Sequence, residues 1–270
     1  MSATKRQSAV APEHTPPRPT RPTDRRHFGI GIVCSLPTEA QTVRNLFDYY
    51  WDNGPGSEKV PGDPNLYSMG AIGSHNVVLV YLPGAGKVNA AHASAFLRHN
   101  FPSIQLVLLV GTCGAVPLLP ESHDIVALGD VMISEGAIEY DMGKRYGNRL
   151  HRDTDHLSCL GRPKPEIMSL IAKLKGWRCR EINQRPAVHF GLFATGDTVV
   201  ASGSQRDRLA QKEGVVAFET EAAGVWDTFP CVVIKGVSNH ADGRKQTEWQ
   251  HYAAVAAASC AKKFFAILVT

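Results

Sequence analysis

The sequence lacks a hydrophobic run long enough to cross a membrane, and it lacks paired cysteines. No apolar stretch reaches the ~18 residues that a spanning helix needs, and no charged-then-apolar leader follows Met1. The 270 residues include only 6 cysteines, none of them in a Cys-x-x-Cys pair. Such scattered cysteines argue against a zinc ribbon or a disulfide scaffold and indicate reduced thiols. These absences predict a cytoplasmic protein that has neither a metal site nor a membrane partner.

The chain also has little net charge beyond its first residues. Residues 1–27 hold six of the 29 basic residues and two of the 25 acidic residues of the chain. The rest of the chain therefore carries equal numbers of positive and negative side chains. A neutral body argues against a nucleic-acid partner, which needs a basic face. Five prolines and very few large apolar residues predict that 1–27 is a disordered Pro/Arg-rich tail, either a flexible leader or a docking arm.

From residue 28 onward, short apolar segments rich in β-branched residues alternate with helical patterns. The segments are almost continuously hydrophobic, as expected for strands buried on both faces. Helical periodicity is clearest from Trp249 to Phe264. This alternation predicts one α/β domain over 28–270, with a central mixed, mostly parallel β-sheet flanked by helices. The predicted strands are 28–36, 77–82, 106–110, 125–133, 190–194, 215–218 and 231–237, and 52–65 is a predicted surface loop.

Two glycine turns follow predicted strands but lack the established nucleotide-binding patterns. Gly84-Ala85-Gly86-Lys87 opens a helix, yet Tyr81 and Val88 stand where a P-loop requires Gly and Ser or Thr. Gly111-Thr112-Cys113-Gly114 is the second turn. A glycine turn at a helix N-terminus suits an anion or a ligand rich in hydroxyls. With no dinucleotide fingerprint and no metal-ligand spacing, the sequence predicts no cofactor.

Three acidic residues stand where predicted strands end. Glu39 lies in the first turn of a helix, where the helix dipole alone can stabilise it. Glu219 and Glu221 are two residues apart, so they share one side of an extended backbone. Burying two carboxylates costs several kcal/mol unless each finds donors. Those donors are either the hydroxyls of a ligand or a structural Arg or Lys. The segment 238–242 follows a further strand and is expected at the same edge of the sheet.

These strand ends carry six ordered segments that resemble the purine nucleoside phosphorylase and methylthioadenosine nucleosidase superfamily, particularly its fungal-type members. The resemblance runs from about residue 28 to the C-terminus. It implies a phosphorylase/hydrolase-like fold and a homo-oligomer, a dimer or a trimer of dimers, whose pockets are completed across a symmetric interface. The segments are 31–40, 83–88, 110–114, 195–198, 218–221 and 237–242.

The resemblance also implies roles for individual residues. Glu221 would accept hydrogen bonds from the ribose hydroxyls and stabilise positive charge on the sugar, and Glu39 would activate water. Val199 and Val200 would line the purine pocket, and Thr220 stands where the family usually has a methionine under the ribose. The other implied substrate contacts are Gly86, Thr112, Gly114, Glu219, Asp242 and Trp249.

Asn239 departs from the family pattern, which has an aspartate at this place that protonates or hydrogen-bonds purine N7. An amide donates a hydrogen bond but cannot act as a general acid, and losing that role costs on the order of 10²–10⁴ in rate. Three explanations remain open. The residue was changed to trap a substrate, it suits 6-oxopurines, or the protein binds its ligand without turnover.

The nucleophile and the 5′ end of the substrate are further expectations. Leu109 stands where phosphorylases have a phosphate-binding arginine and Glu39 would repel phosphate, so water is favoured as nucleophile. The predicted activity is release of adenine from an adenine nucleoside or nucleotide such as adenosine or ATP. The alternatives are a phosphorylase and a catalytically silent binding module. The candidate 5′-phosphate contacts are Lys87, Arg244 and Lys245. Further basic candidates are Lys144, Arg145, Arg206 and Arg208. The alternative is that these basic residues are ordinary solvated surface charges.

Overall fold

A computed structural model describes residues 19–52, 58–147, 149–152, 160, 163–178, 186–244 and 247–268. Nearly continuous apolar segments form most strands of its main sheet, as the sequence predicts. The strands are β1 (Ile30–Cys34), β2 (Tyr49–Tyr50), β3 (Leu66–Ile72), β4 (His75–Tyr81), β5 (Leu106–Ala115), β6 (Val131–Glu139), β7 (Gly143–Tyr146), β8 (Arg149–Arg152), β9 (Val188–Thr195), β10 (Val215–Glu219) and β11 (Cys231–Asn239).

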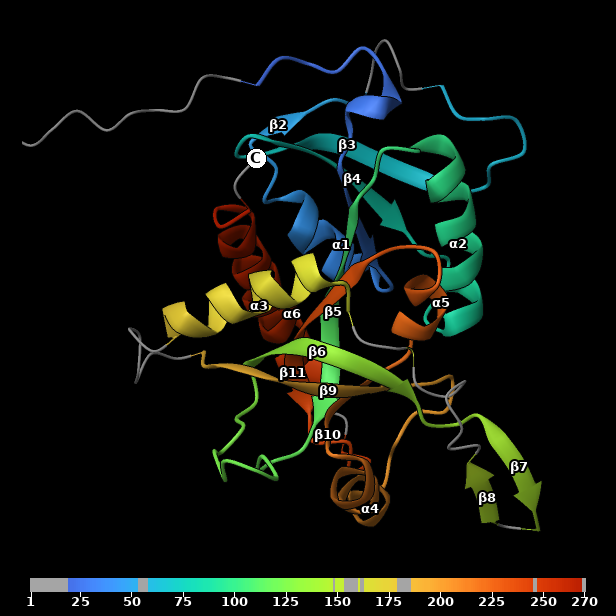
Figure 1. Ribbon diagram of the computed structural model, residues 1–270, viewed down its shortest axis with the longest axis vertical. Helices are drawn as coiled ribbons and strands as arrows, with labels where there is room; N and C mark the ends of the chain where they lie inside the picture. Colours follow the sequence, from blue (N-terminus) through green and yellow to red (C-terminus); the bar gives the residue numbers. More distant parts are fainter. Residues whose placement is uncertain are drawn as a thin grey trace, which may run out of the picture.

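Helices lie on both faces of the sheet that these strands form (Figure 1). The strand order is β10-β9-β6-β11-β5-β1-β4-β3-β2, and β7 pairs with β8 separately. Strands β4, β1, β5 and β11 are parallel, whereas β6 runs antiparallel to β11. The sheet is therefore mixed, as predicted. The helices are η1 (Arg25–His27), α1 (Pro37–Arg44), α2 (Lys87–Asn100), α3 (Pro165–Arg178), α4 (Gly203–Glu213), α5 (Ala222–Trp226) and α6 (Thr247–Phe265).

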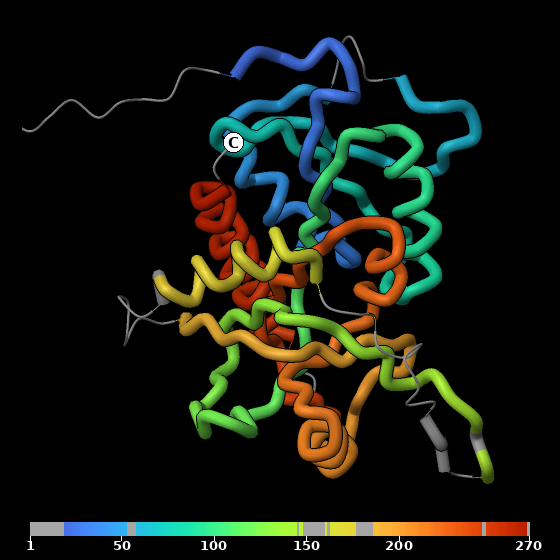
Figure 2. The backbone as a smooth tube through the Cα atoms, viewed as in Figure 1, coloured from blue at the N-terminus to red at the C-terminus, as the bar shows by residue number. Residues whose placement is uncertain are grey.

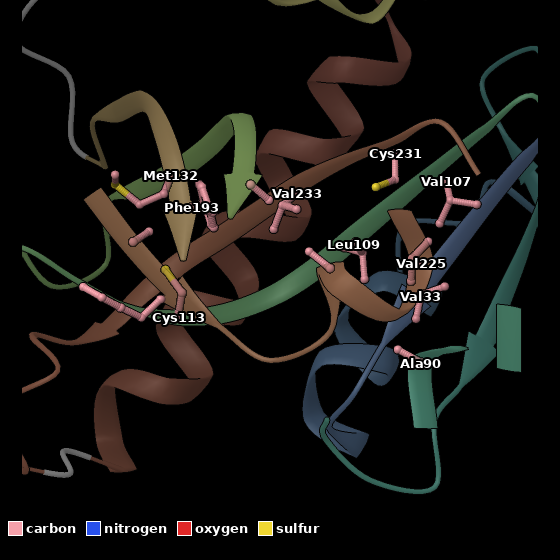
Figure 3. Packing of buried hydrophobic residues seen from close by; sticks show 14 of the residues in the cluster. Val33, Ala90, Val107, Leu109, Cys113, Met132, Phe193, Val225, Cys231 and Val233 are labelled. Carbon is pink, nitrogen blue, oxygen red and sulfur yellow. The ribbon is translucent and has the colours of Figure 1, made fainter. Parts of the chain in front are cut away.

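The central strands bury both faces of the sheet in separate apolar clusters. Leu109 and Val233 point into one cluster, part of which Figure 3 shows around β5 and β11. Leu108 and Ile234, their neighbours in sequence, point into the other cluster. The alanine-rich face of α6 packs directly on β11, where a Cβ on Gly236 would lie 2.0 Å from the Ala253 carbonyl oxygen. Burial on both faces fixes the register of these strands and so positions their carboxyl ends.

Several element boundaries differ from the sequence prediction. Strand β6 begins at Val131 rather than at residue 125, because the preceding segment forms a turn in which Asp130 accepts the Ala127 N–H. Strand β3 was not predicted, and its Gly70 packs against Phe47, where a Cβ would lie 2.3 Å from the ring.

The ordered part of the domain also begins before the predicted boundary at residue 28. Helix η1 spans Arg25–His27, and Arg25 donates a 2.7 Å hydrogen bond to Asn100 Oδ1. Arg21 donates to the Trp51 carbonyl oxygen at 2.9 Å. Figure 2 shows this blue segment crossing the end of the domain that carries β2 and β3. Residues 19–27 of the predicted tail thus include helix η1, and residues 1–18 lie outside the described residues.

Membrane-spanning helices, metal-ion clusters and cysteines are described for the same residues. No helix among them is long and apolar enough to span a membrane. In the same part of the chain, no group of three or more His, Cys, Asp or Glu side chains is placed to hold a metal ion. Four cysteines are free thiols, of which Cys34, Cys113 and Cys231 are buried and Cys260 is partly buried. Cys159 and Cys179 lie outside the described residues.

Candidate functional site

Glu39 lies in the first turn of α1, and its buried carboxylate reaches the carboxyl-terminal half of β5. Its Oε1 accepts from Thr112 N at 2.7 Å and Thr112 Oγ1 at 2.9 Å. Its Oε2 accepts from Leu36 N at 3.0 Å and from the Ser35 hydroxyl at 3.2 Å. Gly111 makes room for this carboxylate, because a Cβ there would lie 2.6 Å from the Glu39 carboxyl carbon. The protein thus orients Glu39 as an acceptor at the end of β5.

Glu221 follows β10 and is paired with a lysine that our sequence analysis did not single out. Lys235 Nζ lies 2.9 Å from Glu221 Oε2, and Thr220 Oγ1 donates to Glu221 Oε1 at 2.5 Å. Burial alone would raise the pKa of Glu221, but the Lys235 charge, hydrogen bonds from Thr220 and Lys235, and the Gly86 N–H lower this pKa to about 2. Glu221 is therefore a fixed negative charge in the interior.

Lys235 brings the three predicted carboxylates to one place. Its ammonium is buried in the middle of β11, and burial acts to lower its pKa. The negative charges of Glu221, Glu39 and Glu219 outweigh this effect and raise the Lys235 pKa well above its ordinary value. The signal in the sequence is a lysine inside the otherwise apolar run Cys231–Val237. Glu39, Glu219 and Glu221 converge on this lysine although 180 residues of sequence separate the first from the second.

Glu219 has a structural role in this cluster. Its Oε2 accepts from Glu221 N at 2.9 Å and from Ala222 N at 3.1 Å, which caps the start of α5. Burial and the neighbouring Glu221 carboxylate raise the pKa of Glu219 to about 7, although Lys235 and hydrogen bonds from Thr195 and Glu221 oppose the shift. Glu219 therefore supports the backbone that carries Glu221.

Asn239 ends β11 beside the second glycine turn. Its Oδ1 accepts from Ala241 N at 2.8 Å, and its Nδ2 donates to Ser238 Oγ at 3.2 Å. Gly114 permits this arrangement, because a Cβ at residue 114 would lie 3.0 Å from Asn239 Oδ1. Asn239 is only partly buried at the end of β11.

The first glycine turn starts α2 and carries a lysine that is surrounded by carboxylates. Lys87 Nζ pairs with Glu139, lies 3.3 Å from Asp141 Oδ1 and 4.0 Å from Asp197 Oδ2. The Lys87 N–H also donates to Asp197 Oδ1 at 2.8 Å. Gly86 has φ of +114°, a conformation that favours glycine. Three carboxylates thus face the one ammonium group of Lys87.

The other basic candidates occupy different surroundings. Arg206 is nearly buried and bonds the His240 carbonyl oxygen at 2.6 Å and Asp207 at 2.7 Å. Arg244 is exposed, and its backbone N–H donates to Asp242 Oδ1 at 3.1 Å. Lys144 and Arg208 are also exposed. Lys245 lies outside the described residues, as does the side chain of Arg145.

The two valines that were expected to line the purine pocket differ in exposure. Val200 is buried in the core, whereas Val199 is 70% exposed. Trp249 lies edge-on to Tyr252 with ring centroids 5.6 Å apart, and both line an open groove of about 570 Å³ with Gly129 and Asp130. The lining residues of this groove do not include Glu39 or Glu221.

In open α/β sheets, ligands commonly bind outside the carboxyl ends of the strands. The family model of the phosphorylase superfamily matches residues 29–270. The chain therefore belongs to this superfamily, as the sequence segments indicated.

The chain is also similar to curated relatives and, in fold, to solved structures. A 5′-methylthioadenosine/S-adenosylhomocysteine nucleosidase of Mycobacterium bovis is 23% identical over 88% of this chain and 96% of its own length. A "Nucleotide-binding leucine-rich repeat (NLR)-like protein" of Hyaloscypha variabilis is 29% identical over 89% of this chain, which spans only 29% of that relative. A Helicobacter pylori nucleosidase variant shares the fold at a TM-score of 0.70, with 21% identity over 89% of this chain and 99% of its own. That variant has asparagine in place of an aspartate and holds 5′-methylthioadenosine in its active site. The Streptococcus pneumoniae nucleosidase with 8-aminoadenine is 25% identical over 89% of this chain and 100% of its own, at a TM-score of 0.69.

Proposed function

We propose that this protein is a purine nucleoside N-ribosyl hydrolase that releases free purine. The observation that carries the proposal is the convergence of Glu39 and Glu221, each of which follows a strand, on the buried Lys235 in the middle of β11. In this mechanism Glu221 binds the ribose hydroxyls, and its negative charge stabilises the positive charge that develops on the sugar. Glu39, oriented by Thr112 and Leu36, positions and deprotonates water. The purine then leaves beside Asn239.

Water is the proposed nucleophile because the surroundings of Glu39 do not suit phosphate. A phosphate dianion would meet the negative charge of Glu39, and Leu109, at the place of the family's arginine, is fully buried in the core. Base release should therefore proceed in phosphate-free buffer at the rate seen with phosphate. A strict requirement for phosphate would identify the protein as a phosphorylase instead.

The contacts of the basic residues favour a substrate with an uncharged 5′ end over a nucleotide. Lys87 is outnumbered by Glu139, Asp141 and Asp197, and Arg206 is engaged by His240 and Asp207. Arg244, Lys144 and Arg208 are exposed, and of these Arg244 lies beside Asp242. We therefore expect adenosine to be cleaved faster than ATP. If ATP is preferred, reversing the charge of Arg244 and Lys245 should slow its cleavage specifically.

A catalytically silent nucleoside-binding module is the second candidate. Asn239 supports it, because an amide cannot protonate a leaving purine. The similarity to one segment of an NLR-like protein also supports it, since the chain corresponds to 29% of that relative. This candidate predicts tight binding of a purine nucleoside and no free base, even for Asn239→Asp.

One chromatographic experiment separates these functions. Purified protein and its Asn239→Asp variant are incubated with adenosine, inosine, 5′-methylthioadenosine and ATP, with and without phosphate, and free base is measured. The hydrolase gives free base and ribose, whereas the phosphorylase gives ribose 1-phosphate. Absence of base from both forms with every substrate would refute the proposed activity. Sedimentation of the same samples tests the homo-oligomer that the family resemblance implies.

A further inference from the structure

The turn that follows β11 contains a residue in a strained backbone conformation. Ala241 is buried and has φ of +49°, in the left-handed region that a residue with a Cβ rarely adopts. The Ala241 N–H donates to Asn239 Oδ1 at 2.8 Å, and a Cβ on Gly114 would lie 3.1 Å from the Ala241 Cβ. Such a conformation persists only where the surrounding contacts hold it.

The bond to Ala241 also fixes which way the Asn239 amide points. A backbone N–H can only donate, so the amide oxygen faces Ala241 and the NH₂ group is turned away from it. One N–H of this group donates to Ser238 Oγ at 3.2 Å, and the Ser238 hydroxyl donates to the Cys113 carbonyl oxygen at 3.2 Å. The second N–H of Asn239 is the one that a ligand nitrogen can accept.

Arg206 of α4 bonds the residue between Asn239 and Ala241. Its Nη1 donates to the His240 carbonyl oxygen at 2.6 Å. Its Nε donates to Asp207 Oδ1 at 2.8 Å, and its Nη2 lies 2.7 Å from the same oxygen, which fixes the plane of the guanidinium group. The Arg206 side chain is only 10% exposed, and a buried arginine is costly unless it is paired and hydrogen-bonded. The guanidinium group therefore holds the His240 carbonyl group in one place.

A second contact joins the start of α4 to the same turn. Gly243 has φ of +85°, and a Cβ there would lie 2.8 Å from the Ala201 carbonyl oxygen. Ala201 directly precedes Ser202, whose side chain caps α4 by accepting from Gln205 N. The segment 201–206 thus contacts the turn at two points.

We propose that Arg206 is a positioning residue, which holds the turn so that the second N–H of Asn239 faces N7 of the purine. Without the bond from Arg206, the His240 peptide group is free to rotate and Ala241 can leave its strained conformation. Asn239 Oδ1 then loses the donor that orients the amide, and an amide oxygen cannot donate to a purine nitrogen. This inference rests on the proposed function, because it takes a purine nucleoside as the ligand.

The test compares the binding of carbocyclic adenosine and of its 7-deaza analogue by calorimetry. Neither probe has a glycosidic acetal, so neither is cleaved, and only the first has N7. The proteins are the unaltered chain, Arg206→Met and the control Lys212→Met, which removes an exposed positive charge from α4. We expect the unaltered chain and the control to bind carbocyclic adenosine about five- to tenfold more tightly than the analogue, the usual effect of one hydrogen bond. In Arg206→Met this preference should fall below about twofold, with binding of the analogue unchanged.

A general loss of structure would weaken both probes equally, so that result overturns the inference, as does a preference that survives in Arg206→Met. Equal binding of both probes by the unaltered chain also overturns it, whereas release of base from adenosine would still support the proposed function. If neither probe binds any of the proteins, the proposed function fails as well. Should Arg206→Met not fold, Asp207→Ala removes the exposed residue that orients the guanidinium group. Loss of the preference in Asp207→Ala supports the inference, and its retention overturns it.

Discussion

Lys235 Nζ lies 2.9 Å from Glu221 Oε2, and the two side chains form an ion pair that is almost completely removed from solvent. The pair joins the middle of β11 to the residue that follows β10. The attraction between two buried charges offsets the cost of desolvating them only when both are well hydrogen-bonded. Here Thr220 also donates a hydrogen bond to the carboxylate, which adds to its stabilisation by Lys235.

Replacing Lys235 by Met should therefore destabilise the protein more than an average core substitution. The variant leaves Glu221 buried beside Glu219 without its cation, which we expect to cost about 3–5 kcal/mol in the free energy of unfolding. Urea denaturation measures the effect. The matched control is the double variant Lys235→Met/Glu221→Gln, in which no charge is stranded. If the double variant is no more stable than Lys235→Met alone, the pair does not carry the energy assigned to it.

The sequence predicts most of the central sheet because β1, β5 and β11 are buried on both faces and are therefore almost purely apolar. It does not predict β3, whose Ser68 and Gly70 weaken the hydrophobic pattern. Gly70 is required there by the close approach of Phe47, a contact that no local pattern encodes. The same limit applies to Lys235. Its strand was predicted, but its partner Glu221 lies on another element, and sequence spacing does not show which carboxylate faces the lysine.

Glu39→Gln should lower the rate of base release by about 10²–10⁴ while nucleoside binding remains. The amide keeps the size of the side chain but cannot take a proton from water. The NH₂ group of the glutamine would also face a backbone N–H such as that of Leu36 or Thr112, from which it cannot accept a hydrogen bond. Turnover is measured by chromatography and binding by calorimetry. Glu166→Gln, the same change at an exposed residue of α3, should leave both unaltered. Equal turnover in Glu39→Gln and the unaltered chain would exclude Glu39 as the base.

Asn239→Asp should raise base release on the order of 10²–10⁴. The aspartate keeps the acceptor that bonds Ala241 N and adds a titratable proton for the leaving purine. The pH profile of turnover separates the two effects, since a gain caused by general-acid catalysis disappears as the new carboxyl group ionises. A pH-independent gain, or equal rates for the two forms, would show that residue 239 does not transfer a proton.

The raised pKa of Glu219 predicts a pH dependence of stability. Because this pKa is about 7 in the folded protein against an ordinary value of 4.5, the folded state holds the proton more tightly than the unfolded state. The stabilisation that this provides is fully present below pH 4.5 and is lost as the pH rises through about 7. Urea denaturation between pH 5 and pH 8 should show this decline in the free energy of unfolding. The Glu219→Gln variant should lack the part of the decline that comes from Glu219. If the difference between the two proteins is constant over that range, the Glu219 pKa is not raised.

Gly111→Ala tests whether the position of Glu39 matters independently of its charge. A Cβ at residue 111 would lie 2.6 Å from the Glu39 carboxyl group, so the carboxylate must move away from Thr112. A shift of this size at a reacting group costs about 10² in rate. Gly29→Ala is the matched control, because no heavy atom lies within 4 Å of a Cβ at that position. We expect slow base release with nucleoside binding intact in Gly111→Ala, and normal turnover in Gly29→Ala. Normal turnover in both would mean that Glu39 acts from another position, and the proposed water-activating geometry would be wrong.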